Sequence, residues 1–198
     1  DYISVAAVEA QELWTHPWSV AGGGATDLLK ALSDLPAKLG AAIRSIGRVS
    51  HTGMDDAYVA SRRALLRAGV PAGLISDFVE GDKVRDWRVA PPTQLAFPYT
   101  DGGQTLIGDM AVLRYLWPCR SGLWERSEPQ GTHREMGWTW YQLSRFHPER
   151  YDGPGIGFAF KATHNHFVLD RGGKVFNRTA PVIKLPAGAT EEEHLALL

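Results

Sequence analysis

The sequence predicts an α+β, or mixed α/β, fold, and three observations point to it. Apolar residues recur at spacings of three and four early in the chain, which is typical of helices. Short apolar runs separated by glycine turns dominate the last third, which is typical of strands. The chain has 198 residues, 44% of them hydrophobic and 22% charged. This composition fits one globular domain with, at most, an appendage, and the order of helices before strands favours the α+β class.

The first helix is expected from residue 26 onward, with a break at Pro36 because proline cannot continue a helix. Gly22–Gly24 precedes this helix, but no apolar strand leads into the glycines, so a cofactor-binding role there is a minor alternative. We divide the chain after this helical segment, into a lead-in of residues 1–42 and a main domain of residues 43–198. The apolar stripe of the helical segment consists of Leu28, Leu32, Leu35, Leu39 and Ile43, the last of which is the first residue of the main domain.

The middle of the chain predicts alternating strands and helices. Strands are expected at residues 43–49, 74–79 and 94–99, and helices at residues 55–68 and 109–117. The last of these helices is expected to turn four side chains inward: Met110, Leu113, Leu116 and Trp117.

Residues 132–146 predict a helix with two different faces. One face is apolar and suits a core, whereas the other is a basic and aromatic stripe at spacings of four, three and four. A glycine at position 137 opposes this helix by about 1 kcal/mol relative to alanine. The stripe consists of Arg134, Trp138, Tyr141 and Arg145.

The last third predicts four strands and the start of a helix. The strands are expected at residues 158–161, 167–170, 174–176 and 181–185. From residue 191, three glutamates fill a first helical turn, where the helix dipole favours negative charge. The chain stops there without a C-cap, and it starts at an aspartate rather than a methionine. We therefore expect a piece of a longer protein.

Charge and composition narrow the functional classes. The formal net charge is −1, with 21 Lys and Arg against 22 Asp and Glu, but residues 81–178 carry 13 basic against 10 acidic side chains. This excess of +3 is a weak indication of an anionic partner. One cysteine, Cys119, cannot form an internal disulfide. No apolar run approaches 18 residues, so we expect a cytoplasmic protein without a membrane partner.

Few motifs favour catalysis by this chain. Gly153–Gly157 resembles a glycine loop, but a strand rather than a helix is expected after it, so we interpret it as a turn. No Gly-x-Ser-x-Gly elbow is present, and we expect no catalytic residue. His164 and His166 point the same way if they lie on a strand. Because the remaining histidines and the cysteine are scattered, no zinc spacing exists and we expect no metal. These histidines and Asn165 fit base contacts or plain polar positions.

Four groups of cations and aromatic residues favour nucleic acid as the partner. They lie in residues 81–88, in residues 120–126, in the stripe of residues 134–145 and at Lys161. Cations contact phosphates, and aromatic rings stack on bases or enter between them. Each group alone also fits a solvated surface or a core tryptophan, but together they favour DNA or RNA.

The order of several motifs resembles the target recognition domain of large adenine-specific DNA methyltransferases. Phe78–Trp87 resembles the G-x-D-[IV]-x-x-[WY] signature, and Thr52–Tyr58 the upstream T-G-x-[DN]-x-A-[FY] segment. Leu123–Arg126 with Trp140–Leu143 resembles the W-x-x-x…WY-x-L region, and His166–Pro186 the closing strands. The resemblance is to the TaqI-like specificity domain, in particular that of PglX-type enzymes of BREX phage-defence systems, and it covers roughly residues 43–198.

The resemblance implies a domain of mixed or antiparallel strands flanked by helices that recognises a sequence in double-stranded DNA. It also implies a separate catalytic domain that binds S-adenosylmethionine and receives a flipped adenine. This chain lacks the Asn-Pro-Pro-Tyr motif of that domain, so we expect no cofactor in the chain itself. The expected partners are DNA, the catalytic domain of the parent protein and further phage-defence subunits.

The residues themselves, rather than the resemblance, give the candidate DNA contacts. Those expected to hold phosphates are Lys83, Arg85, Arg88 and Lys161. Those expected to face base edges or distorted backbone are Arg134, Trp138, Tyr141, Arg145, His164 and Asn165.

The alternative from another class is a protein-interaction or scaffold domain without DNA readout. Its near-neutral charge and seven tryptophans fit a protein interface. DNA affinity that falls steeply with salt distinguishes the first hypothesis from this one.

Overall fold

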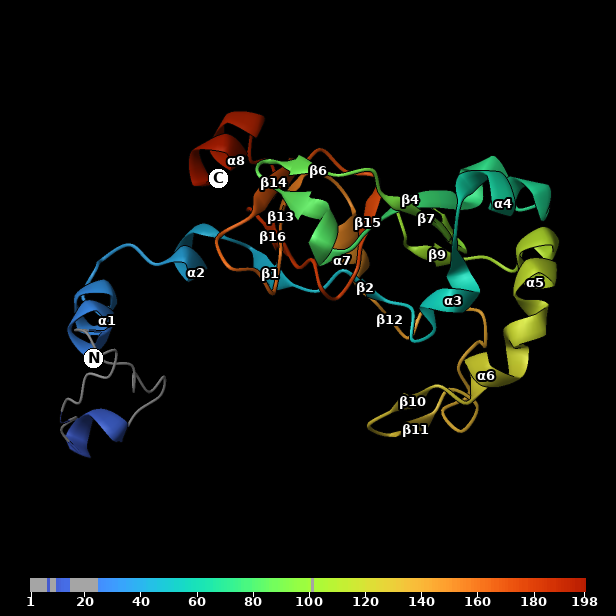
Figure 1. Ribbon diagram of the computed structural model, residues 1–198, viewed down its shortest axis with the longest axis horizontal. Helices are drawn as coiled ribbons and strands as arrows, with labels where there is room; N and C mark the ends of the chain where they lie inside the picture. The colour runs from blue at the N-terminus through green and yellow to red at the C-terminus, as the bar shows by residue number, and fades with distance from the viewer. Residues whose placement is uncertain (1–6, 8–9, 15–24, 101) are drawn as a thin grey trace, which may run out of the picture. The chain divides into compact units, whose positions relative to one another are not determined.

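The computed structural model describes residues 7, 10–14, 25–100 and 102–198 (Figure 1). Helices accompany several antiparallel and mixed sheets, which confirms the predicted α+β class. The chain divides into two compact units, residues 1–42 and 43–198, and each is described by itself below. No helix in the described part of the chain has the length and apolar character needed to cross a bilayer.

The first unit contains the predicted helical segment, interrupted as expected around Pro36. Its elements are η1 (Ala10–Leu13), α1 (Ala25–Ser33) and α2 (Leu39–Ala42). The ammonium of Lys38 donates to the carbonyls of Leu32 and Ser33, at 3.1 and 2.6 Å, and so pairs the end of α1 with a cation. The leucines of the predicted stripe are exposed on this unit. Gly22–Gly24 lies outside the described residues.

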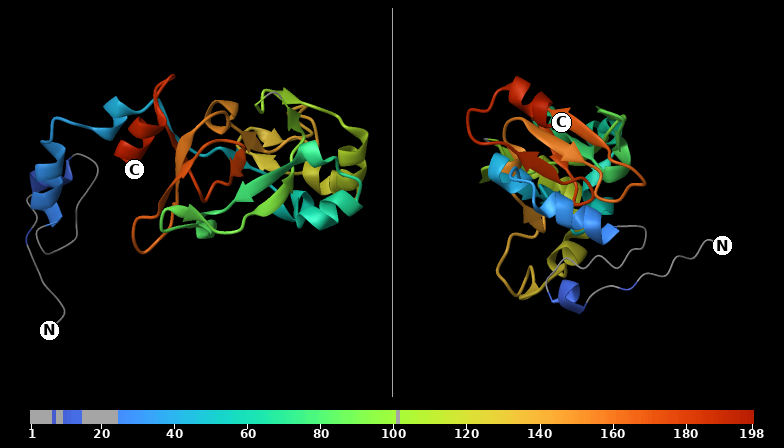
Figure 2. Two further views of the ribbon diagram at one scale, coloured as in Figure 1. Left: turned by 90° about the horizontal axis from the view of Figure 1, so that it is seen from above. Right: turned by 90° about the vertical axis from the view of Figure 1, so that its left-hand side faces the viewer.

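The second unit contains an antiparallel sheet in the order β1-β16-β13-β14. Its strands are β1 (Ser45–Gly47), β16 (Val182–Lys184), β13 (Gly155–Phe158) and β14 (Phe167–Asp170). Figures 1 and 2 show the three later strands, in orange to red, beside β1 in blue. Strands were expected at these places, but β13 starts three residues earlier than predicted. Gly157 lies against the ring of Phe176, where a Cβ would not fit, so the glycines belong to the strand.

A second four-stranded sheet is mixed, in the order β15-β4-β7-β3. Its strands are β15 (Lys174–Phe176), β4 (Ile75–Val79), β7 (Thr93–Ala96) and β3 (Val59–Ala60). The β15–β4 pair is parallel and the others are antiparallel. Buried residues of this sheet form the main core with α4 and α5, and a smaller core joins the two sheets. The smaller core consists of Val49, Val79, Val84, Val168, Phe176, Ala180 and Val182.

Four two-stranded pairs and several short helices complete the second unit. The pairs are β2 (Ser50–His51) with β12 (Arg145–Phe146), β5 (Val84–Arg85) with β6 (Arg88–Val89), β8 (Tyr99–Thr100) with β9 (Thr105–Leu106), and β10 (Ser127–Glu128) with β11 (Gly131–Thr132). The helices are α3 (Asp55–Tyr58), α4 (Arg62–Arg67), η2 (Ala72–Leu74), η3 (Gly81–Lys83), α5 (Met110–Leu116), η4 (Trp117–Cys119), α6 (Arg120–Trp124), α7 (Pro148–Tyr151) and α8 (Glu191–Leu197).

Two helix predictions need correction. The helix expected at residues 55–68 is split, because Val59 leaves it to pair with Leu95 of β7 as strand β3. In α5, Met110 and Trp117 do not face inward but are 69% and 58% exposed. Leu116 is buried as expected, and Val112 takes the inward place of Met110. The Asp109 side chain caps this helix by accepting from the Ala111 and Val112 amides.

The helix predicted at residues 132–146 does not form, and the stripe of Arg134, Trp138, Tyr141 and Arg145 does not exist as one face. The chain instead makes turns, with Gly137 at φ +67°. A buried guanidinium explains this path. Arg126 donates to the carbonyls of Trp140 and Gln142, at 2.9 and 2.8 Å, and to those of Leu123 and Thr52. Carbonyls that converge on one cation are unavailable for a helix.

Candidate nucleic-acid interface

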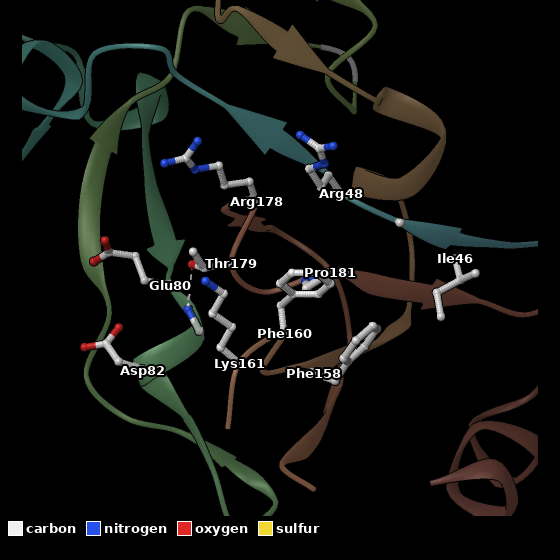
Figure 3. Close-up of a pocket in the computed structure, with 12 residues that line it drawn as sticks. Ile46, Arg48, Glu80, Asp82, Phe158, Phe160, Lys161, Arg178, Thr179 and Pro181 are labelled. Carbon is white, nitrogen blue, oxygen red and sulfur yellow. Dashed lines mark hydrogen bonds between the residues drawn. The ribbon is translucent and has the colours of Figure 1, made fainter. Parts of the chain in front are cut away.

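A hollow of about 940 Å³ lies in the second unit. One wall of the hollow consists of the end of β13 and the 159–166 connection that follows it. The end of β1, the η3 turn and the segment before β16 form the other walls. Figure 3 shows the guanidinium groups of Arg48 and Arg178 along one side and the carboxylates of Glu80 and Asp82 along another. The lining residues are Ile46, Gly47, Arg48, Glu80, Gly81, Asp82, Phe158, Phe160, Lys161, Arg178, Thr179 and Pro181.

Glycine at position 81 is required for this arrangement. The Gly81 amide donates to the Thr179 hydroxyl at 3.0 Å, and a Cβ at Gly81 would collide with the Thr179 carbonyl. The close approach holds the η3 turn against the segment that carries Arg178. The G-x-D pattern of the sequence therefore positions one wall of the hollow.

The cations of the hollow are not neutralised by neighbouring carboxylates. In the described part of the chain, no side chain forms an ion pair or a hydrogen bond with the side chains of Arg48, Lys161 or Arg178. Asp82 instead pairs with Lys83, at 3.7 Å. Burial, followed by the charge of Asp82, raises the pKa of the Glu80 carboxyl. The hollow therefore offers three cations to an anionic ligand.

Two smaller hollows continue the first one. A hollow of about 210 Å³ shares Gly47 and Arg48 with it, and one of about 430 Å³ shares Arg145 and His147 with the second. We call the three together the basic groove. Its cations are Arg48, Arg145, Arg150, Lys161 and Arg178.

Backbone contacts fix the centre of the basic groove. Arg150 donates to the Arg48 carbonyl at 2.9 Å, and its guanidinium carbon would lie 3.3 Å from a Cβ on Gly47. Glycine at position 47 therefore lets the arginine pack flat on the strand. The pKa of His51 is lowered by burial and then by the charge of Arg178, so this part of the groove opposes further positive charge.

The basic groove also presents apolar rings. Phe160 is 64% exposed beside Lys161, and Trp138 lines the far end. The ring of Phe158 packs on Phe167 of the neighbouring strand, with centroids 5.7 Å apart. An exposed ring next to a cation is the combination that single bases or unstacked steps bind.

The structure brings only some of the sequence-predicted residues into the basic groove. Lys161, Arg145 and Trp138 line it, and His164 and Asn165 follow Lys161 in the same connection. Arg145 is already paired with Glu128 through two donors, at 2.9 and 2.6 Å.

The other predicted residues lie apart from the groove lining. Arg85 donates to the carbonyls of Gly81 and Val84, and Lys83 pairs with Asp82. Arg134 pairs with Glu125 at 3.5 Å and lies over the ring of Trp124. Tyr141 packs against the main core, and Arg88 is exposed on β6.

Sequence reasoning missed Arg48, Arg150, Arg178 and Phe160 as groove residues. Arg178 lies in the segment Lys174–Pro186 that the resemblance singled out, so a signal existed for it. Arg48 and Arg150 each look like an isolated surface cation in the sequence, and only the fold brings them together.

The chain was also compared with known proteins. No protein-family model matches it. Over 206 aligned residues, which include the whole of this chain, it is 38% identical to the adenine-specific methyltransferase PglX of Streptomyces coelicolor. The chain resembles one piece of PglX. It spans only 17% of the length of that protein, so the similarity supports a fragment of a PglX-type methyltransferase.

Proposed function

We propose that this chain is the DNA-recognition part of a larger adenine-specific DNA methyltransferase of the PglX type, with a TaqI-like specificity domain at residues 43–198. The observation that carries the proposal is the set of three unpaired cations, Arg48, Lys161 and Arg178, around one hollow with an exposed phenylalanine. The basic groove would receive the sugar-phosphate backbone of double-stranded DNA.

Roles within the basic groove follow from side-chain chemistry. Arg48, Lys161 and Arg178 neutralise phosphates and set the position of the duplex. Phe160 stacks on a base or enters a base step, which opens the duplex locally. Trp138, at the other end of the groove, offers a second stacking surface. His164 and Asn165 supply donors and acceptors for base edges beside Lys161.

Methyl transfer belongs to another part of the longer protein in this proposal. Residues 155–157 of the segment Gly153–Gly157 lie within strand β13, so the segment does not form the glycine-rich helix start that holds a phosphate-bearing cofactor. We place S-adenosylmethionine, and the pocket for the flipped adenine, in the catalytic domain of the parent. Phage defence of the BREX kind is the cellular role that fits this enzyme.

Exposed leucines on the first unit favour contact with another domain of the longer protein. The exposed leucines at positions 28, 32, 35 and 39 form the apolar side of its helical segment. We propose that residues 1–42 pack against the catalytic domain of the parent rather than against DNA. Lysines in place of Leu28 and Leu32 would then weaken methylation by the parent and leave DNA binding by this chain unchanged.

The test of the DNA proposal is binding to random 20-base-pair duplexes at two salt concentrations. A triple variant with alanine for Arg48, Lys161 and Arg178 should bind more weakly, and its salt slope should be smaller by about 3, since each phosphate contact contributes about 0.9. Arg67→Ala is the matched control, because this exposed arginine on α4 lines none of the three hollows.

The same substitutions in the full-length parent, assayed for methylation with its methyl donor, complete the test. Reduced methylation by the triple variant and normal methylation by the control support the proposal. Equal DNA affinity of the triple variant and the unmodified chain, together with unchanged methylation by the parent variant, would overturn it.

A further inference from the structure

Three side chains that can bind a metal lie close together, one on the turn between β5 and β6 and two at the end of the 159–166 connection. One ligand atom from each of Asp86, His164 and His166 lies within 4.8 Å of the other two. We propose that these three side chains bind a divalent transition-metal ion of the zinc class. His164 is also one of the base-edge contacts of the proposed function, but the metal proposal rests on the spacing of the three ligands and does not depend on that function.

One ligand of the site is fixed and two can adjust. His166 is only 6% exposed, and its carbonyl accepts from the Ala159 amide at 3.1 Å, which extends the β13–β14 ladder by one step. Its Nδ1 lies 3.4 Å from Oδ1 of Asp86, whose side chain is 73% exposed. The ring of His164, also exposed, stands 4.2 Å from that of His166 between centroids.

These spacings fit tetrahedral coordination after a small movement. Zinc–ligand bonds of 2.0–2.2 Å in a tetrahedron separate neighbouring ligand atoms by about 3.3–3.5 Å. The separation between Asp86 and His166 already has this value. The remaining approach, from at most 4.8 Å, falls on the exposed ring of His164, whose Nδ1 lies 3.1 Å from the Thr163 hydroxyl.

The backbone holds Asp86 at this place in an unfavourable conformation. Asp86 and Trp87 have φ values of +46° and +68°, in the left-handed region. Two-residue turns of this kind usually contain asparagine or glycine, and a tryptophan there is strained. The Asp86 amide also donates to Nδ1 of His166 at 3.3 Å, a hydrogen bond that coordination of a metal through Nδ1 would replace. The turn therefore points the carboxylate and the amide of one residue at the same imidazole.

The donor set selects the class of metal. Two imidazoles and one carboxylate suit zinc, cobalt, nickel or copper rather than magnesium or calcium, which prefer all-oxygen sites. The guanidinium of Arg85, the neighbouring cation, is turned back to the carbonyls of Gly81 and Val84. Three protein ligands leave a coordination position for water or another ligand.

A bound ion would join two segments that carry the rim of the basic groove. The 159–166 connection contains Phe160 and Lys161, and the β5–β6 hairpin follows directly on the η3 turn. A metal bridge between them would restrict both segments at once. Metal binding should therefore raise the melting temperature of the chain.

The test uses the full chain after removal of metal, titrated with Co²⁺ and followed by visible absorption, and then with Zn²⁺ against a chromogenic chelator. We expect one ion per chain with micromolar or tighter affinity, and at least a tenfold loss in Asp86→Asn and in His164→Gln. Both positions are exposed, so circular dichroism should show an intact fold. Asp56→Asn, which removes another exposed aspartate, is the matched control and should leave affinity unchanged.

Zinc should raise the melting temperature of the unmodified chain but not that of the two ligand variants. Binding of less than about one fifth of an ion per chain, or affinity that survives both ligand substitutions, would overturn the proposal. An equal loss of affinity in the Asp56 control would overturn it as well, because it would show binding to surface charge alone.

Discussion

Replacing Arg126 with methionine removes the guanidinium around which residues 132–146 fold. Its Nε donates to the Leu123 carbonyl at 2.8 Å, and its terminal nitrogens donate to the carbonyls of Thr52, Trp140 and Gln142. Arg126 itself is only 6% exposed. Methionine retains most of the apolar stem but no donor. The carbonyls of Leu123, Thr52 and Trp140 therefore lose this partner, and that of Gln142 keeps only the Tyr58 hydroxyl, at 3.1 Å.

The expected loss of stability follows from these four hydrogen bonds. Three orphaned carbonyls cost about 1 kcal/mol or more each, and loss of the charged donor to the Gln142 carbonyl costs about 1 kcal/mol, which gives roughly 4 kcal/mol. Burial of the guanidinium lowers the pKa of Arg126, and the variant no longer has this desolvation cost, so we expect a net loss of about 3 kcal/mol. For a chain of this length that corresponds to a fall in melting temperature of roughly 6–12 °C.

The assay is urea unfolding of the full chain, followed by tryptophan fluorescence and by circular dichroism. Arg134→Met is the control, because the exposed guanidinium of Arg134 pairs with Glu125 at 3.5 Å and such pairs contribute at most about 1 kcal/mol. A loss below 1 kcal/mol in Arg126→Met, or equal losses in the two variants, would refute the role given to the buried cation.

Three further predictions concern stability. Burial and the charge of Arg126 lower the pKa of His133 to about 4. The free energy of unfolding should therefore fall as the pH drops from 6.5 to 4, because the unfolded chain binds the proton first. In urea titrations across this range, His133→Gln should show a flatter dependence of unfolding free energy on pH, and an identical dependence would contradict this. Gly53→Ala should lower the free energy of unfolding by about 2–4 kcal/mol, because φ is +75° and the new Cβ would overlap the Ser144 hydroxyl. Gly137→Ala, at a similar φ in open space, should lower it by only about 1 kcal/mol. Equal losses in the two variants would exclude the contact with Ser144 as the cause. Burial lowers the pKa of Lys184 to about 8, so unfolding free energy should rise between pH 8 and 10.5, where the unfolded chain retains the proton, and Lys184→Met should abolish that rise in the same measurement.

Local sequence patterns predicted seven of the eight strands in the two four-stranded sheets. They missed the short two-stranded pairs, and they failed where a distant side chain decides the path of the chain. The runs at 167–170, 174–176 and 181–185 carry enough apolar, β-branched and aromatic residues to be identified alone, and α8 was visible from its three glutamates. Residues 132–146 have a helical period, yet Arg126 captures their carbonyls from outside the segment. Propensity is a weak guide where tertiary contacts of this strength compete with it.

The candidate sites were harder to predict than the strands, because their residues lie far apart in the sequence. Lys161 and Arg145 were predicted as contacts because each lies among other cations or aromatic residues. Arg48 and Arg178 lie far apart along the chain, and their proximity depends on how β1 and β16 pair. The same holds for the metal ligands: the spacing of His164 and His166 alone indicates no zinc site, because Asp86 comes from a different hairpin.

The pairing of β1 with β16 and of β4 with β15 has a consequence for synthesis and for engineering. Both sheets join strands of the first half of the chain to strands near the C-terminus. The sheet with β4 therefore closes only after residue 176 has left the ribosome, and the sheet with β1 only after residue 184. Such non-local topologies fold slowly, and a nascent chain would expose the unpaired edges of β1 and β4 to chaperones in the meantime. Exchange of this module between parent enzymes should therefore use junctions outside residues 45–184, because any internal junction would combine strands of different origin within one sheet.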